Sequence, residues 1–597
     1  MDDQLQQAAS QPEVFLLYKG GQVTEELRRS LSHVRIVPQA TRVRVGPQVK
    51  EIANGAFRYC VRLTELQFNE GLEVIGEHSF SDCTSLRSVT LPPSVTRLGQ
   101  WAFYRCSGLV ELQLNEGLQV IGANAFCGCT ALRSLTLPSS VTELRGSAFN
   151  LCSGLVELQL KEGLQIIGSG AFWNCKSLQS VTVPSTVTEL GWRAFCGCKN
   201  LAEARLVEGL RCIGERAFED CLALRCVTIP STVTELCRGA FYGCSGIKEL
   251  RLNEGLQVIG ADAFQKCTAL QSVSIPSTIK ELGPCTFYNC SNLVELQLEE
   301  GLRIIGKEAF HNITSLRSVS IPSTVTLLGE KAFIHCSNLI EVRLNEGLQS
   351  IGGDAFAYCS ALRSVTVPST VTKLGDTAFS DCSNLSEVIF LDGKRLLDQE
   401  FVECGFGREE QGLLNREALD KMLFDEGSMD FAFHGCPLIM LKISISWAVS
   451  ERMARLPLEC KLSLEERIHY LRRFEVLQDG EVLACFPVVV SRATGDNTDD
   501  DSDEESEYYL PYPDDETEDS TYEVLDTNFE TARSLYQVHK LIAFYELKES
   551  SIIIELAFWK AMIDQGGDRA CRAAIPGPAK SLLMEYCGFT GFLRPAF

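Results

Sequence analysis

The sequence predicts an α/β-type repeat solenoid, rich in β-strands and built from 23-residue repeats, followed by a mainly helical C-terminal extension. Three regularities predict it. A cysteine lies three residues after almost every repeated phenylalanine, and a leucine lies three residues later, with Ile313 and Ile247 as the exceptions. A small residue, usually alanine, precedes the phenylalanine, and a glycine closes most units. The phenylalanines recur at an unbroken interval of 23 residues, at Phe57, Phe80, Phe103, Phe126, Phe149, Phe172, Phe195, Phe218, Phe241, Phe264, Phe287, Phe310, Phe333, Phe356 and Phe379.

Each unit contains one segment with the two-residue period of a half-buried strand. In one such segment Leu112 and Leu114 alternate with Glu111 and Gln113. A strand this short cannot bury a core alone, so it must pair with its copies in the preceding and following units. At about 4.8 Å per strand, the fifteen units would stack to roughly 70 Å around a continuous core of phenylalanine, leucine and cysteine.

A second period of 46 residues is superimposed on the first. After the strand, one class of unit carries Asn-Glu-Gly-Leu, as at Asn115–Leu118 and Asn253–Leu256. The other class carries Pro-Ser-Thr-Val or a close copy, as at Pro184–Val187 and Pro230–Val233. Glycine supplies a positive φ in one class and proline fixes φ in the other, so both segments are expected to form corners of the coil.

The combined pattern, Val/Leu-x-Leu, Pro-Ser-Thr-Val, Leu-Gly and Ala-Phe-x-x-Cys, resembles the BspA-like (Treponema-type) leucine-rich-repeat family over about residues 43–390. The resemblance implies a curved solenoid with a binding role, and such proteins in bacteria and some protists are often surface adhesins. The polar, acidic start of the sequence predicts no secretory signal. The two ends, including Val34 to Ile36 and Tyr545–Tyr586, resemble intracellular-type members from diatoms and related algae.

Seven segments are expected along the chain. They are residues 1–13, a disordered N-terminus; 14–56, an N-terminal cap; 57–390, the solenoid of 15 leucine-rich repeats; 391–446, an inserted helix at Asn415–Leu423 and a closing repeat at 431–446; 447–494, an α/β C-terminal cap; 495–530, an acidic disordered linker; and 531–597, a C-terminal helical region.

Local signals predict the elements of the C-terminal part. A capping box formed by Ser463 and Glu466 predicts a helix that runs to about Phe474. Asp479-Gly480 predicts a tight hairpin between Phe474–Leu477 and Val482–Phe486. Three further helices are expected, at Ser534–Tyr545, Ser550–Ile563 and Ala579–Tyr586.

The net charge of −23 is concentrated in one segment. Between Asp496 and Glu530 there are sixteen acidic residues and no lysine or arginine. This balance argues against nucleic acid as a partner, since phosphate binding requires clustered lysine and arginine. No apolar stretch is long enough to span a bilayer, so we expect a cytoplasmic or nuclear protein without a membrane span.

The 26 cysteines and seven histidines show no arrangement that suggests chemistry. Disulfides between neighbouring repeats are conceivable, but Ile313 replaces one cysteine of the row, and isoleucine can substitute only for a buried apolar thiol. Metal-type spacings are missing. We therefore expect reduced core cysteines, no metal, no cofactor and no catalysis. The additional thiols Cys212, Cys226, Cys237 and Cys285 fall outside the row and are candidates for exposure.

The outward face of the strands is the candidate binding surface, and its expected partners are other proteins or peptides. This predicts a non-enzymatic interaction scaffold; the alternative is a cell-surface or secreted adhesin of the BspA-like type. Ser502, followed by Asp-Glu-Glu, is in addition a candidate phosphorylation site. The candidate contact residues are Glu111, Gln113, Glu157, Gln159, Glu203, Arg205, Glu249, Arg251, Glu295, Gln297, Glu341 and Arg343.

Overall fold

The computed structural model describes residues 16–18, 40–397, 413–423, 431–469, 471, 473–477, 481–492, 520–524, 535, 538 and 540–546. They belong to two compact units. The first unit holds the coils up to Arg363, with Val371–Leu385 and 431–436. The second holds Ser364–Thr370 and most of the chain after Ser386. Within these residues, no helix has the length and apolar character needed to cross a lipid bilayer.

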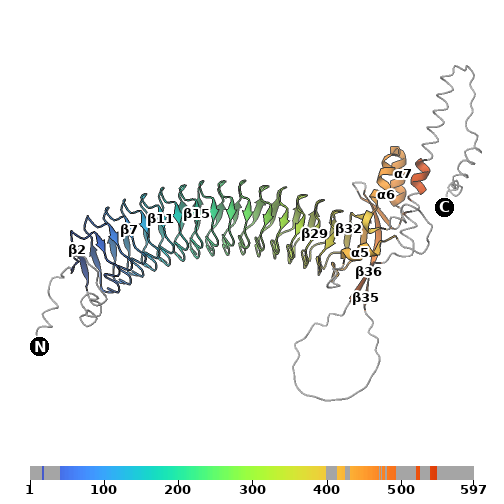
Figure 1. Cartoon of the computed structure of the whole chain (residues 1–597). Helices are drawn as coiled ribbons and strands as arrows, with labels where there is room; N and C mark the ends of the chain where they lie inside the picture. The colour runs from blue at the N-terminus through green and yellow to red at the C-terminus, as the bar shows by residue number, and fades with distance from the viewer. Residues whose placement is uncertain are drawn as a thin grey trace, which may run out of the picture. The chain divides into compact units, whose positions relative to one another are not determined.

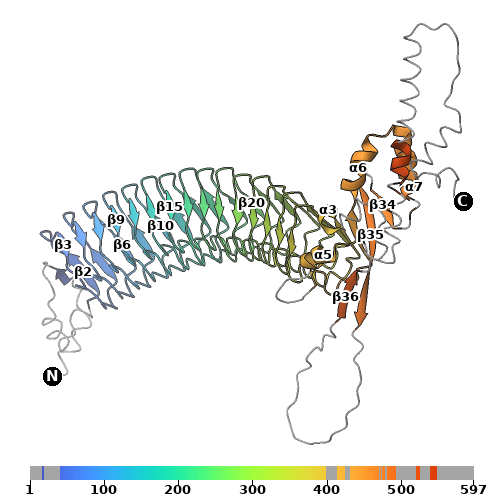
Figure 2. The same ribbon diagram turned by 45° about the vertical axis from the view of Figure 1, so that its right-hand side comes forward.

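The first unit is a stack of 23-residue coils, which Figure 1 shows as one curved row. Each coil contributes one strand to a row of parallel strands, which hydrogen-bond as four successive sheets, and we call the outward surface of this row the strand face (Figure 2). Except in β1, whose middle residue Leu17 is exposed, these strands have the two-residue alternation that the sequence predicts, with the second residue facing the core. They are β1 (Leu16–Tyr18), β2 (Arg42–Val45), β4 (Glu65–Gln67), β6 (Ser88–Thr90), β8 (Glu111–Gln113), β10 (Ser134–Thr136), β12 (Glu157–Gln159), β14 (Ser180–Val183), β16 (Glu203–Leu206), β18 (Cys226–Thr228), β20 (Glu249–Arg251), β22 (Ser272–Ile275), β24 (Glu295–Leu298), β26 (Ser318–Ile321) and β28 (Glu341–Leu344).

Each coil also contains a second strand of only two residues, which was not predicted from the sequence. These short strands form one parallel sheet of 15 strands, and the second residue of each is buried. They are β3 (Glu51–Ile52), β5 (Val74–Ile75), β7 (Arg97–Leu98), β9 (Val120–Ile121), β11 (Glu143–Leu144), β13 (Ile166–Ile167), β15 (Glu189–Leu190), β17 (Cys212–Ile213), β19 (Glu235–Leu236), β21 (Val258–Ile259), β23 (Glu281–Leu282), β25 (Ile304–Ile305), β27 (Leu327–Leu328), β29 (Ser350–Ile351) and β31 (Lys373–Leu374).

The repeated phenylalanines form a continuous stack through the core. Phe218, for example, is fully buried, and its ring centroid lies 5.4 Å from that of Phe195 and 5.2 Å from that of Phe241. Rings in this stack are nearly parallel, as in the pair Phe103 and Phe126, whose planes differ by 1°. The repeated cysteines are buried beside them as free thiols. The thiol of Cys221 donates to the carbonyl of Phe195 at 3.3 Å, and other coils repeat this contact.

A third set of contacts between coils surrounds each phenylalanine. The backbone N–H groups of Phe218 and Asp220 donate to carbonyls of the next coil, at Ala240 and Tyr242, over 2.8 Å each. These N–H groups point along the stack toward the next coil. The residues two before and two after the phenylalanine adopt left-handed backbone angles, with φ of 55° at Arg216 and 57° at Asp220. The coil is therefore tied to its neighbour on three sides by backbone hydrogen bonds.

The 46-residue period corresponds to an alternation between two kinds of coil interface. Strands that begin with serine, such as β14, alternate with strands that begin with glutamate, such as β16, and we call them serine-class and glutamate-class strands; β18, which begins with Cys226, belongs to the serine class. From a serine-class strand to the next glutamate-class strand, three or four residues pair, as between β14 and β16. From a glutamate-class strand to the next serine-class strand, at most one residue pairs, as between β16 and β18. The predicted corners close this second interface. Glu208 of the Glu-Gly-Leu corner accepts the backbone N–H groups of Ser231 and Thr232, each at 3.1 Å, and the Ser231 hydroxyl at 3.0 Å.

We call this arrangement the corner clamp; Glu116, Glu162 and Glu300 form the same contacts one or more coil pairs away. The backbone N–H of Ser231 and the other donors stabilise the carboxylate and lower the pKa of Glu208. Gly209 is needed beside the clamp, because its φ is +116° and an added Cβ would lie 2.1 Å from the carbonyl oxygen of Ser185. Pairs of coils are thus joined alternately by strand pairing and by the clamp.

The second unit contains a mixed sheet in the order β30-β32-β33-β35-β34, with β36 paired to β35. Parallel pairing ends at β33, and β35 runs antiparallel to β33, β34 and β36. The Lys442 ammonium group bridges Glu387 and Glu475 across the sheet, over 2.8 Å and 2.5 Å. The strands are β30 (Ser364–Val367), β32 (Glu387–Phe390), β33 (Met440–Ser444), β34 (Phe474–Val476), β35 (Val482–Arg492) and β36 (Ser520–Val524), and the helices are α3 (Gly393–Leu396), α5 (Arg416–Leu423), α6 (Ser446–Ala454) and α7 (Leu458–His469).

Several local predictions for this unit can be compared with the structure. The hairpin between β34 and β35 is confirmed, as is the helix after Asn415, whose side chain accepts the N–H of Ala418 at 3.2 Å. The helix expected to start at Ser463 begins five residues earlier, so the capping-box interpretation of Ser463 was wrong; its hydroxyl instead contacts that of Tyr545 at 2.9 Å.

The acidic segment 495–530 was expected to be disordered throughout, but Ser520–Val524 pair with β35, so that expectation was wrong for these five residues. A Ser-Thr-Tyr-Glu-Val run is rich in residues that favour strands, which outweighs the acidity of the flanking sequence. Residues 540–546 are helical and overlap the end of the helix predicted at Ser534–Tyr545, which they exceed by one residue. Residues 1–13, most of the acidic segment and the last two predicted helices lie outside the described residues.

Candidate functional site

The strand face carries its exposed side chains in columns, because the strands that pair do so in register and equivalent residues recur every 23 residues. Ser180 stands opposite Glu203 and Thr182 opposite Arg205, and the same register recurs between β22 and β24. All twelve candidate contact residues named from the sequence are exposed on this face. One column therefore alternates glutamate with short side chains, and the next alternates glutamine or arginine with threonine or serine. The glutamates lie two coils apart, or roughly 10 Å.

The structure adds a third column, which was not predicted from the sequence. Its members precede the serine-class strands and are Arg87, Arg133, Arg225, Arg317 and Arg363. All five are exposed, and none forms an ion pair with another residue that the structure describes. Their recurrence at multiples of 46 residues was the signal that could have identified them. In the intervening coils the same column presents partly exposed apolar residues, including Val110, Val294 and Ile340.

Few contacts within the chain occupy the charges of this face. Glu341 pairs with Arg343 at 2.6 Å and Glu249 with Arg251 at 3.7 Å, both along a single strand. For Glu111, Glu157, Glu203 and Glu295 no ion pair with a described residue is found. The face is thus an array of opposite charges in neighbouring columns, and most of these charges remain available to another molecule.

One hollow interrupts the arginine column where Gln271 replaces arginine. It has a volume of about 500 Å³ and is open to solvent. Its wall combines carboxylate, amide and hydroxyl groups with one apolar side chain, contributed by Gln271, Ser272, Asn292, Val294, Glu295 and Ser315. Such a mixture suits a protruding side chain that has an apolar stem and a polar or cationic end.

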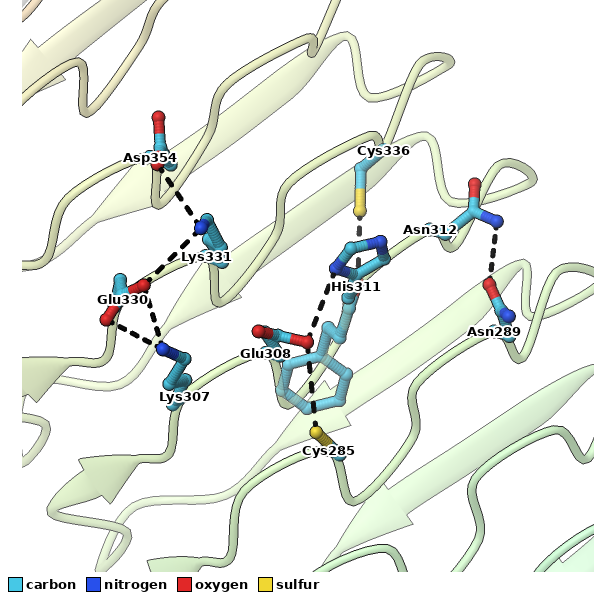
Figure 3. Close-up of polar contacts among 11 residues, drawn as sticks. Cys285, Asn289, Lys307, Glu308, His311, Asn312, Glu330, Lys331, Cys336 and Asp354 are labelled. Carbon is cyan, nitrogen blue, oxygen red and sulfur yellow. Dashed lines mark hydrogen bonds and ion pairs between the residues drawn. The ribbon is translucent and has the colours of Figure 1, made fainter.

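A second polar surface, on the turns that follow the short strands, differs in being paired internally. Figure 3 shows a ladder in which Lys307 contacts Glu330 at 2.9 Å, Glu330 contacts Lys331 at 3.5 Å, and Lys331 contacts Asp354 at 3.8 Å. Charges that are already neutralised by neighbouring coils offer less to a partner. Of these two polar surfaces, the strand face is therefore the better candidate for binding a partner.

His311, which Figure 3 shows beside Glu308, packs against side chains of its own and the neighbouring coil. His311 Nδ1 lies 3.8 Å from Glu308, and its ring lies 4.3 Å from that of Tyr288. Burial lowers the pKa of His311 and so favours the neutral imidazole. Ser502, the candidate phosphorylation site, lies outside the described residues, and its modification stays a prediction.

Comparisons with known proteins agree with the repeat architecture. A family model described as the BspA type leucine-rich-repeat region matches residues 50–179, 165–294 and 257–386, which together span more than half of the chain. No curated protein matches the sequence. These comparisons concern the repeats, so the resemblance of the chain ends to members from diatoms and related algae stays a prediction.

Solved structures of bacterial proteins are similar to the chain. A leucine-rich repeat protein from Bacteroides ovatus is 27% identical, over 55% of this chain and 79% of that chain, with a TM-score of 0.46. A leucine-rich cell surface protein from Faecalibacterium prausnitzii is 25% identical, over 53% and 76%, with a TM-score of 0.29. A leucine-rich repeat protein from T. pallidum is 29% identical, over 27% and 77%, with a TM-score of 0.25.

Proposed function

Because the chain belongs to the BspA type of leucine-rich-repeat proteins, we propose that it is a non-enzymatic scaffold that binds other proteins through the strand face. One observation carries the proposal. The strand face presents columns in which exposed charged side chains recur at every second coil, and most of them form no ion pair with a described residue. Charges on the turn surface, in contrast, are paired between coils. A surface whose charges have no role in folding is free to serve recognition.

The spacing of the charges defines what a partner must present. Glutamates stand roughly 10 Å apart along their column, which exceeds the Debye length of about 8 Å at physiological salt. Their mutual repulsion is therefore weak, and each can attract a separate basic group. The arginine column beside them requires acidic groups in parallel. A folded protein with both charges fits this requirement, while the phosphate backbone of a nucleic acid would be repelled by the glutamates.

Charge reversal on one face tests the proposal. We expect the triple variant Glu111→Lys, Glu157→Lys, Glu203→Lys to lose partners that the intact chain captures from cell extract, because three attractive contacts become repulsive. The three carboxylates are exposed and make no ion pair with a described residue, so the melting temperature should change little. Capture is measured by affinity purification and quantitative mass spectrometry.

A matched control carries the same change in charge elsewhere. Glu51, Glu189 and Glu281 are exposed on the short-strand sheet. The triple variant with lysine at these three positions should retain the partners. Equal loss in both variants would indicate a non-specific charge effect, and full retention in the strand-face variant would place the binding surface elsewhere.

We further propose a cytoplasmic or nuclear location, with a cell-surface or secreted adhesin as the competing hypothesis. Two observations support a reducing, non-glycosylating compartment. The described cysteines are free, and the row of core thiols donates to backbone carbonyls. The amide nitrogens of Asn312 and Asn384, both in glycosylation-type triplets, donate to Asn289 at 2.7 Å and to the Ser360 carbonyl at 2.6 Å. Free thiols can be counted in protein isolated from its native source. A count far below the number of cysteines would indicate extensive disulfides and would favour the adhesin hypothesis.

A further inference from the structure

Two cysteines outside the core row come together on the outer surface of the short-strand sheet. Cys212 begins β17, at a register position that β13 and β21 fill with Ile166 and Val258. Cys237 directly follows β19, at a position where neighbouring coils carry glycine, including Gly214 and Gly260. Both departures from the repeat fall in adjacent coils. Neither cysteine is required by the core, since other coils fold without it.

The two thiols and a carboxylate converge. Cys212 Sγ lies 3.5 Å from Cys237 Sγ, and Cys237 Sγ lies 3.7 Å from Oε1 of Glu235. The three donor atoms all lie within 4.8 Å of one another. The cysteines are half-buried and Glu235 is exposed, so solvent reaches the cluster from one side. Arg238, which directly follows Cys237, forms an ion pair with Asp262 at 2.9 Å.

Without a cation the cluster is electrostatically unfavourable in its ionised form. Burial raises the pKa of Cys212, and burial together with the neighbouring thiol of Cys212 raises the pKa of Cys237 to about 12. Glu235 adds to both effects. A bound divalent cation would reverse them, because metal binding displaces thiol protons and favours thiolate.

We propose that Cys212, Cys237 and Glu235 form a binding site for a thiolate-preferring divalent cation of the zinc class. Tetrahedral zinc with bonds of about 2.3 Å to sulfur sets its sulfur ligands roughly 3.8 Å apart, close to the 3.5 Å between these sulfur atoms. Thiolate ligands select such ions over calcium and magnesium, which require oxygen. Binding releases the two thiol protons to solvent and forms two sulfur–metal bonds and one oxygen–metal bond, while water completes the fourth position.

A disulfide between the same cysteines fits the backbone less well. Cys212 pairs with Glu235 in the sheet, so Cys237 stands diagonally across from Cys212, two residues further along. Diagonal neighbours in a sheet have Cα atoms about 7–8 Å apart, beyond the range of about 4.4–6.8 Å that a disulfide spans. A metal ion bridges the two sulfur atoms without backbone movement, and it also uses the carboxylate that a disulfide would leave idle.

Cobalt(II) is a direct probe of the site, since it substitutes for zinc and is coloured when bound to thiolate. The full-length chain, reduced and freed of metal, is titrated with cobalt(II). The expected result is a thiolate-to-cobalt charge-transfer band with the visible bands of tetrahedral cobalt, saturating at one ion for this site and bleached by zinc. The variants Cys212→Ile and Cys237→Gly should each lose this saturable band. Both restore the residue found in other coils, so folding, checked by circular dichroism, should be retained.

Matched thiols elsewhere provide the controls. Cys226 is exposed and Cys285 is half-buried, and the variants Cys226→Ser and Cys285→Ser should bind cobalt as the intact chain does. Glu235→Gln should keep the charge-transfer band but bind more weakly. The proposal is overturned if the intact chain gives no thiolate band, or if the band persists in Cys212→Ile or Cys237→Gly. Unchanged affinity in Glu235→Gln would remove the carboxylate from the site.

Discussion

The phenylalanine stack should supply a large part of the stability of each coil, and Phe218→Ala tests this in the middle of the array. Phe218 is fully buried and contacts two rings, at 5.4 Å and 5.2 Å. Removing a buried phenylalanine side chain costs about 3–5 kcal/mol, since the neighbouring coils can close the cavity only in part. Phe218→Leu keeps most of the apolar volume but loses both ring pairs, so it should cost about 1–3 kcal/mol.

Denaturant unfolding followed by far-UV circular dichroism measures the free energy of unfolding for each variant. A stacked array can unfold in sections, so hydrogen exchange should accompany it. Protection should fall most in the coils around Phe195, Phe218 and Phe241 and least near Phe57. The exposed control Gln159→Ala should stay within about 0.5 kcal/mol of the parent. A loss below about 1 kcal/mol in Phe218→Ala, with unchanged exchange in the adjacent coils, would refute the role assigned to the stack.

Two further predictions concern the corners. Donors from the next coil lower the pKa of Glu208, so the folded state binds fewer protons than the unfolded state, and the stabilisation is complete above the ordinary value of 4.5 and lost as the pH falls through the folded pKa. Glu208→Gln should therefore melt below the parent at neutral pH, and the gap should close in acid; a gap independent of pH would contradict this. Gly209→Ala should destabilise the chain by roughly 1–3 kcal/mol, because its φ is +116° and its Cβ would strike the Ser185 carbonyl. Gly71→Ala, at the same position of an earlier coil, would meet nothing closer than 3.5 Å and should be tolerated in the same denaturation assay; equal losses would contradict the steric argument.

The sequence was sufficient to predict the features that repeat as side-chain identities. The spacing of Phe57 to Phe379 established the coil length and the core, and alternation around Leu112 identified the strand and its exposed face. The second strand could not be predicted, because a pair such as Val120–Ile121 is too short to show any period. Its existence depends on hydrogen bonds to the equivalent pairs in neighbouring coils. Local propensity contains no information about them.

The backbone conformation around the phenylalanines also could not be predicted from the sequence. Left-handed angles occur at Tyr59, Arg105 and Leu151, residues that rarely adopt them. The strain is offset by hydrogen bonds from these N–H groups to the next coil, at 2.7–2.8 Å. A bulky side chain at such a position gives no hint of its backbone angle. Only the stacked array explains why it is tolerated.

Some features of the candidate site could likewise be predicted from the sequence, and others required the structure. The glutamate rows follow from the strand period, and the arginine column shares their 46-residue interval and was overlooked. The meeting of Cys212 with Cys237 required the register of the short strands, since 25 residues separate the two thiols in the chain. Each of them breaks the repeat pattern. Paired departures from a repeat in adjacent coils are therefore a useful guide to sites in such arrays.

The corner clamp has a consequence for how this array can change in length. A glutamate corner needs a serine or threonine corner after it, and a well-paired serine-class strand needs a glutamate-class strand after it. Deleting one coil would bring two corners of the same kind together and leave carboxylates without their donors. Deleting two coils would keep each glutamate corner beside a serine or threonine corner. Growth or shrinkage of the protein by duplication and loss is thus restricted to even steps, and so is any attempt to shorten it by design.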